Sequence, residues 1–195
     1  MIKHSEFALQ LKAAANALNK RYDRLFVWAR MHRMENAKTQ KEQKSLALED
    51  LRANELGACT RCDLCRARSH IVFGEGNPNA DLMLIGEAPG KDEDRQGRPF
   101  VGRAGQLLAR LLEEAGFTRE QVYIANVIKC RPPENRTPEP EEVSTCKPFL
   151  LQQVRIIDPK VLVLLGSVAT KAFFGFEKTI SRMRGQELAH EGRVT

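Results

Sequence analysis

Three short runs of apolar residues constrain the fold of this chain more than any other feature. They read DLMLIG at residues 81–86, VYIANVIK at 122–129 and VLVLL at 161–165. Segments with the leucine and alanine spacing of helices lie between and after them, at about residues 105–115, 140–157 and 167–174. Continuous apolar strands that alternate with helices are typical of parallel sheets. The sequence therefore predicts an α/β fold, a central parallel sheet with helices on both faces.

Finer features of the three helices can be predicted as well. Four leucines of the first helix, Leu107, Leu108, Leu111 and Leu112, are expected to lie on one face, and Gly116 is expected to stop the helix. Pro148 is expected to kink or split the second helix, because proline lacks the backbone N–H that an interior turn needs. Ser167 is expected to cap the third helix.

Residues 1–56 differ from the rest and are predicted to form a helical N-terminal extension. Apolar residues recur with helical spacing over residues 5–33, a polar stretch that suggests a solvated helix end or a linker covers 34–44, and a second helix is expected to stop at Gly57. The chain carries a net charge of +6, and most of the excess lies in this part. A basic chain favours an anionic partner, although charge of this size is also common in soluble proteins.

The sequence also indicates where the protein works. It has no run of about 18 apolar residues that would span a membrane, and no pattern of a secretory signal opens the chain. We therefore expect a cytoplasmic protein without a membrane partner.

The five cysteines predict a metal or cluster site. An odd number of cysteines in a chain without a secretory signal argues against a disulfide framework. Cys59 and Cys62 form a Cys-x2-Cys pair, with Cys130 and Cys146 further along, and four thiolates can bind zinc or a four-iron, four-sulfur cluster. The spacing leaves two alternatives open: Cys62 and Cys65 form an equally good pair, and Cys130 and Cys146 are compatible with buried inert thiols.

Polar residues gather where the predicted strands end, which is where ligands bind in such sheets. The loop after the first strand, GEAPGKDEDRQGRPFVGRAGQ at residues 86–106, combines glycines with several carboxylates. These carboxylates can act as a base, bind a cation or stabilise positive charge, or they can simply form an acidic surface turn. Asn126 lies inside an apolar strand, where an unpaired amide is costly, so it is either a structural hydrogen-bonding residue or a ligand-reading one.

Read together, these blocks resemble a known family. The segments CTRCDL, VFGEGNP, LIGEAPGKDEDRQGRPFVGRAGQLL, VYIANVIKCRPPENRTPEPEE, VLVLLGSVA and RMRGQ resemble the family 4 uracil-DNA glycosylases, which are iron–sulfur enzymes. The resemblance covers about residues 57–195, so it implies a uracil-DNA glycosylase-like three-layer domain over that range. Residues 1–56 lie mostly outside it.

The resemblance implies a role for particular residues. It assigns a structural four-iron, four-sulfur cluster to Cys59, Cys62, Cys130 and Cys146, with zinc as the alternative metal. It places Glu87, Ala88 and Pro89 around the uracil and the attacking water, with Glu93 as a further catalytic acid. Phe100 would stack on the extruded base. Asn126 would read the edge of the uracil. The resemblance thus implies that Glu87, Glu93 and Asn126 take part in catalysis.

The activity implied is DNA repair: hydrolysis of the bond between uracil and deoxyribose after the base is flipped into a pocket. The expected partner is uracil-containing DNA, single- or double-stranded. Two alternatives from the same superfamily are a non-catalytic nucleic-acid-binding protein and one that captures uracil DNA covalently. The capturing relatives carry a histidine after the second motif, and residues 130–137 contain none.

One departure from the family is expected to matter. Its members continue into a last strand, a His-Pro motif and a leucine-bearing loop beyond the point where this sequence stops at Thr195. We expect a domain without these parts, and a fragment of this length to be weakly active or inactive. His190 precedes the expected strand and is no substitute for the histidine of that motif.

Overall fold

The computed structural model describes residues 35–175, 189–190 and 193–194. The predicted helix over 5–33 and the RMRGQ segment lie outside the described residues. The chain divides into two compact units, Met1–Gln43 and Lys44–Thr195. In the first unit residues 35–43 are helical and exposed. The sheet and the helices that pack on it belong to the second unit.

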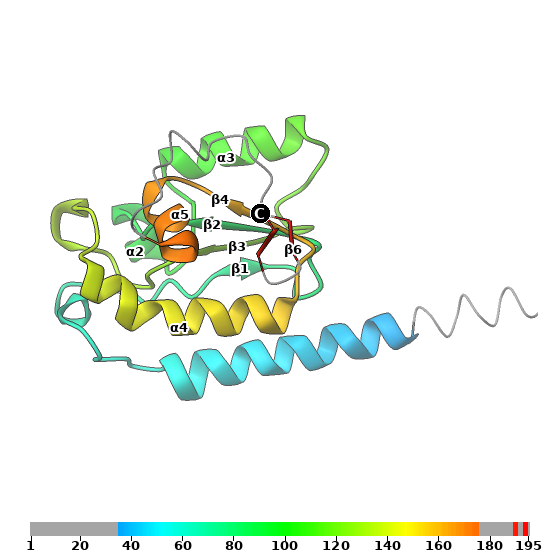
Figure 1. Ribbon diagram of the computed structural model, residues 1–195, viewed down its shortest axis with the longest axis horizontal. Coiled ribbons are helices and arrows are strands. Elements are labelled where there is room, and N and C mark those ends of the chain that lie inside the picture. The colour runs from blue at the N-terminus through cyan, green and yellow to red at the C-terminus, as the bar shows by residue number, and fades with distance from the viewer. Residues whose placement is uncertain (1–34, 176–188, 191–192, 195) are drawn as a thin grey trace, which may run out of the picture. The chain divides into compact units, whose positions relative to one another are not determined.

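A sheet of four parallel strands with an antiparallel strand at each edge forms the centre of this unit (Figure 1). The parallel strands are β2 (Leu82–Gly86), β3 (Tyr123–Asn126), β4 (Val161–Leu164) and β6 (Arg193–Val194). The edge strands are β1 (Glu75–Gly76), which pairs with β3, and β5 (Ala189–His190), which pairs with β6. The order across the sheet is β1-β3-β2-β4-β6-β5. The parallel centre confirms the predicted fold class.

Alternating side chains of the strands build two cores, one on each face of the sheet. Met83, Ile85 and Tyr123 join the larger core, which also contains residues of α4 (Pro140–Ile157) and α5 (Ser167–Phe174). Leu84 and Ile124, the intervening residues, join the smaller core against α3 (Arg103–Glu114). The result is three layers, helix, sheet and helix, and Figure 1 shows α3 and α4 on opposite sides of the sheet.

The helix at residues 44–56 packs within this unit and ends at Gly57, as predicted. Its last part is η1 (Leu51–Leu56), and Leu48, Leu51 and Leu56 are buried in the larger core. The ammonium of Lys44 donates to the carbonyl of Ile157, 2.7 Å away at the end of α4. Because these residues bury their leucines against the sheet domain, we propose that the domain begins near residue 44 and not at residue 57.

The structure adds three details to the predicted helices. Of the four leucines of α3, Leu108 and Leu112 are buried, whereas Leu107 and Leu111 are each 51% exposed, because a helix presents only one stripe of its surface to the sheet. α4 continues through Pro148 as one helix, with Cys146, Phe149 and Leu150 buried on both sides of the proline. Gly166 is the N-cap of α5 and no side chain caps it, so Ser167 is the first helical residue instead.

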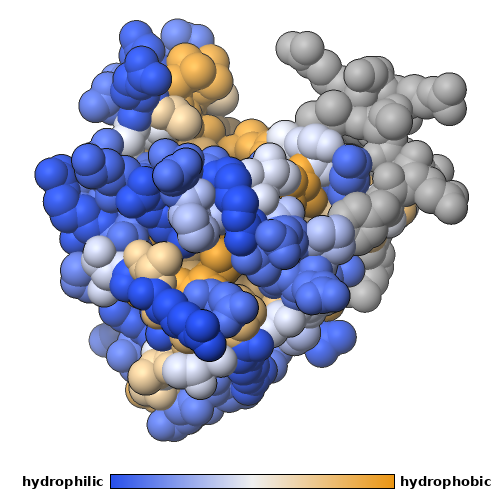
Figure 2. Space-filling view, turned by 90° about the vertical axis from the view of Figure 1, so that its left-hand side faces the viewer, coloured by the Kyte–Doolittle hydropathy of each residue, from blue (hydrophilic) through white to orange (hydrophobic). Residues whose placement is uncertain are grey.

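The carboxyl ends of β2, β3 and β4 meet at one edge of the sheet, and two short elements follow there. They are α2 (Lys91–Gln96) and η3 (Pro133–Asn135), whereas η2 (Asp63–Arg66) precedes the sheet in the chain. Figure 2 looks at the side of the molecule where this edge lies and shows hydrophobic residues surrounded by hydrophilic ones. None of the described helices is long and apolar enough to cross a membrane.

Candidate functional site

Gly86, Phe100 and Asn126 converge at the carboxyl edge of the sheet. Gly86 and Asn126 are the last residues of β2 and β3 and are register partners. A Cβ built on Gly86 would lie 2.5 Å from Asn126 Oδ1 and 2.5 Å from Phe100 Cζ, too close for either atom. Glycine is therefore required here, because only a residue without a side chain lets the amide and the ring approach the strand.

The amide of Asn126 lacks a partner for its oxygen in the part of the chain that the structure describes. Its side chain is only 2% exposed, and its Oδ1 atom is buried without a hydrogen bond. A buried polar atom left unpaired costs about 1–3 kcal/mol, so native proteins keep few of them. An orphaned acceptor beside an aromatic ring is the arrangement expected of a site that awaits a hydrogen-bond donor from a flat ligand.

Lys129 fixes the backbone that carries this amide. The lysine is fully buried, and its ammonium donates to the carbonyl of Asn126 at 2.8 Å and to Gln153 Oε1 at 2.6 Å. Gln153 in turn donates to the carbonyl of Phe73 at 2.9 Å. Burial lowers the pKa of Lys129 to about 8. The end of β3 is thus tied to α4 and to the segment that leads into β1.

Glu87, Ala88 and Pro89 follow Gly86 directly in the loop after β2. Pro89 is buried, and Ala88 is half-buried against the larger core. Glu87 is half-buried, and burial raises the pKa of its carboxyl above the usual value. Its backbone carbonyl accepts a hydrogen bond from Ile128, which joins the ends of β2 and β3. A half-buried carboxylate in the loop after β2 can stabilise positive charge that develops on a bound ligand.

Glu93, the second predicted acid, holds the loop together through its carboxylate. Oε1 accepts hydrogen bonds from the backbone N–H of Val101 at 2.9 Å and of Gly102 at 2.8 Å, and Oε2 accepts one from Gly90 at 3.2 Å. A carboxylate with three backbone donors is well suited to fix a loop. These hydrogen bonds favour a positioning role, and the catalytic role of Glu93 stays a prediction.

Two residues to which the sequence analysis gave no role, Glu75 and Arg119, position Phe100. Phe100 has a φ of 51°, an uncommon conformation for a residue with a side chain. Arg119 donates to the carbonyl of Phe100 at 3.0 Å and also to that of Pro99. Glu75 holds Arg119 through a 2.9 Å hydrogen bond. Because the pairing joins β1 to the loop after α3, no local sequence pattern could reveal it.

The Glu75 carboxylate predicts a dependence of stability on pH. Hydrogen bonds from Arg98 and Arg119 lower its pKa to about 2 from a usual value of 4.5. The stabilisation is therefore present above pH 4.5 and is lost as the pH falls toward 2. We expect Glu75→Gln to lower the free energy of unfolding by about 1–2 kcal/mol at pH 7, allowing for partial exposure.

Urea unfolding of both proteins between pH 2.5 and 7 tests this. The difference between wild type and Glu75→Gln should shrink as the pH drops below 4.5, whereas Glu114→Gln on the exposed face of α3 should give no difference at either end. A difference that stays constant over the whole pH range would contradict the role given to the ion pairs.

The four cysteines assigned by the resemblance lie near one another, around the start of α4. Cys130 and Cys146 are buried, and Cys59 and Cys62 are half-buried against the larger core. Burial raises the pKa of Cys62, Cys130 and Cys146, that of Cys146 to about 11, and neighbouring sulfurs add to each shift. The charges of Cys59 and Cys62 raise the pKa of Cys130, and those of Cys62 and Cys130 raise the pKa of Cys146. Of the three thiols with a raised pKa, Cys65 influences only Cys62.

Hydrogen bonds and packing hold this group in place. The guanidinium of Arg68 donates to Cys130 Sγ at 3.1 Å, and the backbone N–H of Lys129 donates to Cys146 Sγ at 3.3 Å. Arg61, between Cys59 and Cys62, lies 4.6 Å from the centre of the Phe149 ring on α4. Among the described residues, no three His, Cys, Asp or Glu side chains are arranged to hold a metal ion as they stand. The donor set nevertheless fits a cluster, since four sulfurs and N–H donors to them are what such a group needs.

Comparison with known proteins identifies the family of the chain. A sequence model of the Uracil DNA glycosylase superfamily matches residues 73–194. The chain is 49% identical over 142 residues to the type-4 uracil-DNA glycosylase of Thermotoga maritima, covering 72% of this chain and 74% of that protein. It is 46% identical over 144 residues to the type-4 enzyme of Archaeoglobus fulgidus, covering 72% of each.

A type-5 relative is more distant. The type-5 uracil-DNA glycosylase of Thermus thermophilus is 34% identical over 131 residues, which cover 58% of this chain and 59% of that protein. The two type-4 enzymes are both more similar to this chain and matched over more of its length. This chain therefore belongs to the uracil-DNA glycosylase superfamily and, within it, to the type-4 family.

Proposed function

We propose that this protein removes uracil from DNA by hydrolysing the bond between N1 of the base and C1′ of the deoxyribose. The observation that carries the proposal is the Oδ1 of Asn126 near Phe100, which is buried and has no hydrogen-bond partner among the described residues. Uracil presents an N–H flanked by two carbonyls, so one amide can accept from its ring N–H and donate to a neighbouring carbonyl. Phe100 offers a ring for stacking. The base must leave the helical stack to reach such a pocket.

The chemistry follows from where charge develops. As the N1–C1′ bond breaks, its electron pair goes to the uracil, which becomes negative, and the sugar becomes positive. The amide N–H of Asn126 stabilises the uracil oxygen, and the carboxylate of Glu87 stabilises the sugar. Water then adds to C1′, and the proton that it releases goes to the uracil anion, which leaves neutral uracil and an abasic site. Glu87 is half-buried, and the raised pKa of its carboxyl sets the acidic limit of this role.

Hydrolysis is favoured over covalent capture and over mere binding. Residues 130–137 contain no histidine that could attack the sugar. A protein that only bound DNA would have no need to keep an unpaired buried amide, which costs stability. We infer that the protein meets its DNA substrate inside the cell. An assay with single- and double-stranded substrates measures which form of DNA it prefers.

The test is direct. A labelled oligonucleotide with one uracil, alone or opposite guanine, is incubated with the protein and then treated with alkali. Cleavage at the uracil position, with free uracil in solution, supports the proposal. A stable protein–DNA adduct would instead indicate covalent capture, and tight binding without either product would indicate a non-catalytic protein.

We further propose that Cys59, Cys62, Cys130 and Cys146 hold a four-iron, four-sulfur cluster that is structural, since hydrolysis involves no redox change. Once bound, the cluster would cross-link three parts of the chain: the segment of Cys59 and Cys62, the residues after β3, and α4. Metal bound only by the folded chain adds its binding free energy to stability. Zinc is the alternative metal for the same four sulfurs.

Iron analysis separates the ligands from the fifth cysteine. We expect Cys146→Ser to lose most of its iron and the brown colour in anaerobically purified protein, and to unfold at a lower temperature. Cys65→Ser is the matched control and should keep full iron content. Cys65 lies close enough to influence the pKa of Cys62, but it has no influence on the pKa of Cys130 or Cys146. Stoichiometric zinc without iron in wild type, or loss of iron in Cys65→Ser, would contradict this assignment.

A further inference from the structure

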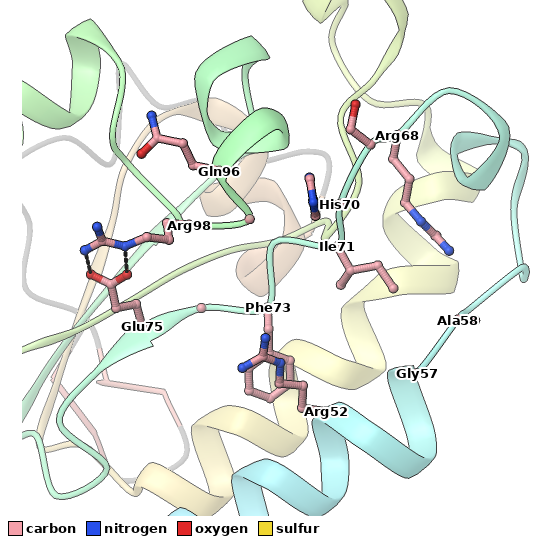
Figure 3. A pocket seen from close by; sticks show the side chains of 13 residues that line it. Arg52, Gly57, Ala58, Arg68, His70, Ile71, Phe73, Glu75, Gln96 and Arg98 are labelled. Carbon is pink, nitrogen blue, oxygen red and sulfur yellow. Dashed lines mark hydrogen bonds and ion pairs between the residues drawn. The ribbon is translucent and has the colours of Figure 1, made fainter.

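A basic pocket lies beside the start of β1, and the proposed chemistry does not use it (Figure 3). Its volume is about 650 Å³, and its charged lining includes Arg52, Arg68, His70, Glu75 and Arg98. We propose that this pocket holds a backbone phosphate, with its sugar, of the DNA strand that carries the uracil. The inference rests on the proposed function, because it names where the substrate is held.

The charges of the lining favour an anion. Glu75 is the one carboxylate among the lining residues, and Arg98 binds it through two hydrogen bonds of 2.6 and 2.8 Å (Figure 3). This pair leaves Arg52 and Arg68 to give the pocket its positive charge. Among the described residues neither has a carboxylate partner. Arginine presents several N–H donors in a fixed fork, which matches the oxygens of a phosphate.

The segment of the pocket wall that carries Arg68, residues 68–70, is held in place before any ligand binds. Arg68 spends one N–H on Cys130 Sγ and keeps its others. The backbone N–H groups of Ser69 and His70 donate to the buried carboxylate of Asp94 at 2.9 and 3.3 Å. The Nδ1–H of the His70 ring donates to the Asp94 carbonyl at 2.8 Å. A preformed wall lowers the entropy lost on binding.

The location suits a phosphate next to the extruded base. Glu75 pairs with Ile124, two residues before Asn126 on the neighbouring strand. Neighbouring strands lie about 4.8 Å apart and two residues of a strand span about 6.6 Å, so Glu75 lies about 8 Å from the backbone of the uracil-reading amide. Arg98 stands two residues before Phe100. A phosphate needs less space than this cavity offers, and the apolar side chain of Ile71 supplies a wall for the sugar.

The salt dependence of DNA binding tests the proposal. Removing one arginine–phosphate interaction lowers the slope of log affinity against log salt by about 0.9. We expect Arg52→Gln to bind uracil-containing oligonucleotide about tenfold more weakly at about 0.1 M salt, with the slope reduced by about one. Arg68→Gln should do the same, and its iron content shows whether the cysteines are still held.

The matched control is Arg155→Gln. Arg155 is exposed near the end of α4, which leads into the amino end of β4, so it lies at the opposite edge of the sheet. This variant should keep the wild-type affinity and slope. If Arg52→Gln and Arg155→Gln change the slope of log affinity against log salt equally, the pocket is no phosphate site. The change in slope then reflects the net charge of the protein.

Inorganic phosphate separates the two sources of the ligand. Millimolar phosphate that binds wild type but not Arg52→Gln in calorimetry, without any effect of Arg52→Gln on DNA binding, would overturn the assignment to DNA in favour of a free phosphate site. The proposed function is judged separately, by uracil release from wild type. Release by wild type together with an unchanged slope in Arg52→Gln and Arg68→Gln would refute this inference alone.

Discussion

Asn126→Ala is expected to slow uracil excision by about 100- to 1,000-fold at saturating DNA, the range seen when one donor to developing charge is removed. DNA binding should weaken far less, because most affinity comes from phosphates and the amide meets only the extruded base. The substitution also removes a buried atom that has no partner in the described structure, so the free protein should not lose much stability.

Single-turnover excision and equilibrium DNA binding, measured on the same preparations, check this. Gln121→Ala is the control, since Gln121 is exposed and lies just before β3, at the end of that strand opposite to Asn126. It should behave as wild type in both assays. An equal loss of binding and excision in Asn126→Ala would show that the amide holds DNA generally and does not read the base.

Gly86→Ala is expected to reduce excision by at least about 100-fold. The new methyl group would lie 2.5 Å from both Asn126 Oδ1 and Phe100 Cζ, so the amide and the ring must move apart. Overpacking of this kind costs about 1–3 kcal/mol of stability, and misplacing catalytic groups by about 1 Å can cost about 100-fold in rate.

A second variant separates loss of geometry from loss of stability. Val122→Ala removes a fully buried side chain at the amino end of β3, away from the site, and should cost a similar amount of stability. Excision below the unfolding temperature should stay close to wild type in Val122→Ala. If Gly86→Ala also kept the wild-type rate, the convergence of Asn126 and Phe100 at Gly86 would not be the base pocket.

Much of the fold could be predicted from local patterns. Apolar runs located β2 and β4 to within about a residue, because strands buried on both faces need continuous apolar sequence. The remaining run, residues 122–129, is longer than its strand, because β3 stops at Asn126 and the apolar residues to Ile128 continue into the loop. The two edge strands β1 and β5 have two residues each, too short to leave any periodicity.

The resemblance selected the residues of the site, but their hydrogen bonds had to come from the fold. It named Asn126, Phe100 and Glu93 from motifs. It said nothing of Arg119, which fixes Phe100, or of Lys129, a buried lysine that a sequence would suggest to be exposed. Their partners, Phe100 and Gln153, are 19 and 24 residues away in the chain.

The sequence by itself determined the three central strands β2, β3 and β4 and the helices α3, α4 and α5 that alternate with them. These follow from the period of apolar residues and from side-chain chemistry, which are local properties. Only the tertiary structure decided that Glu75, Arg98 and Arg119 form one ion-pair group, that Glu93 is held by three backbone donors, and that Arg52 and Arg68 line one pocket. The physical reason is that hydrogen bonds and charge interactions depend on distances between elements, which the packing of the two cores sets.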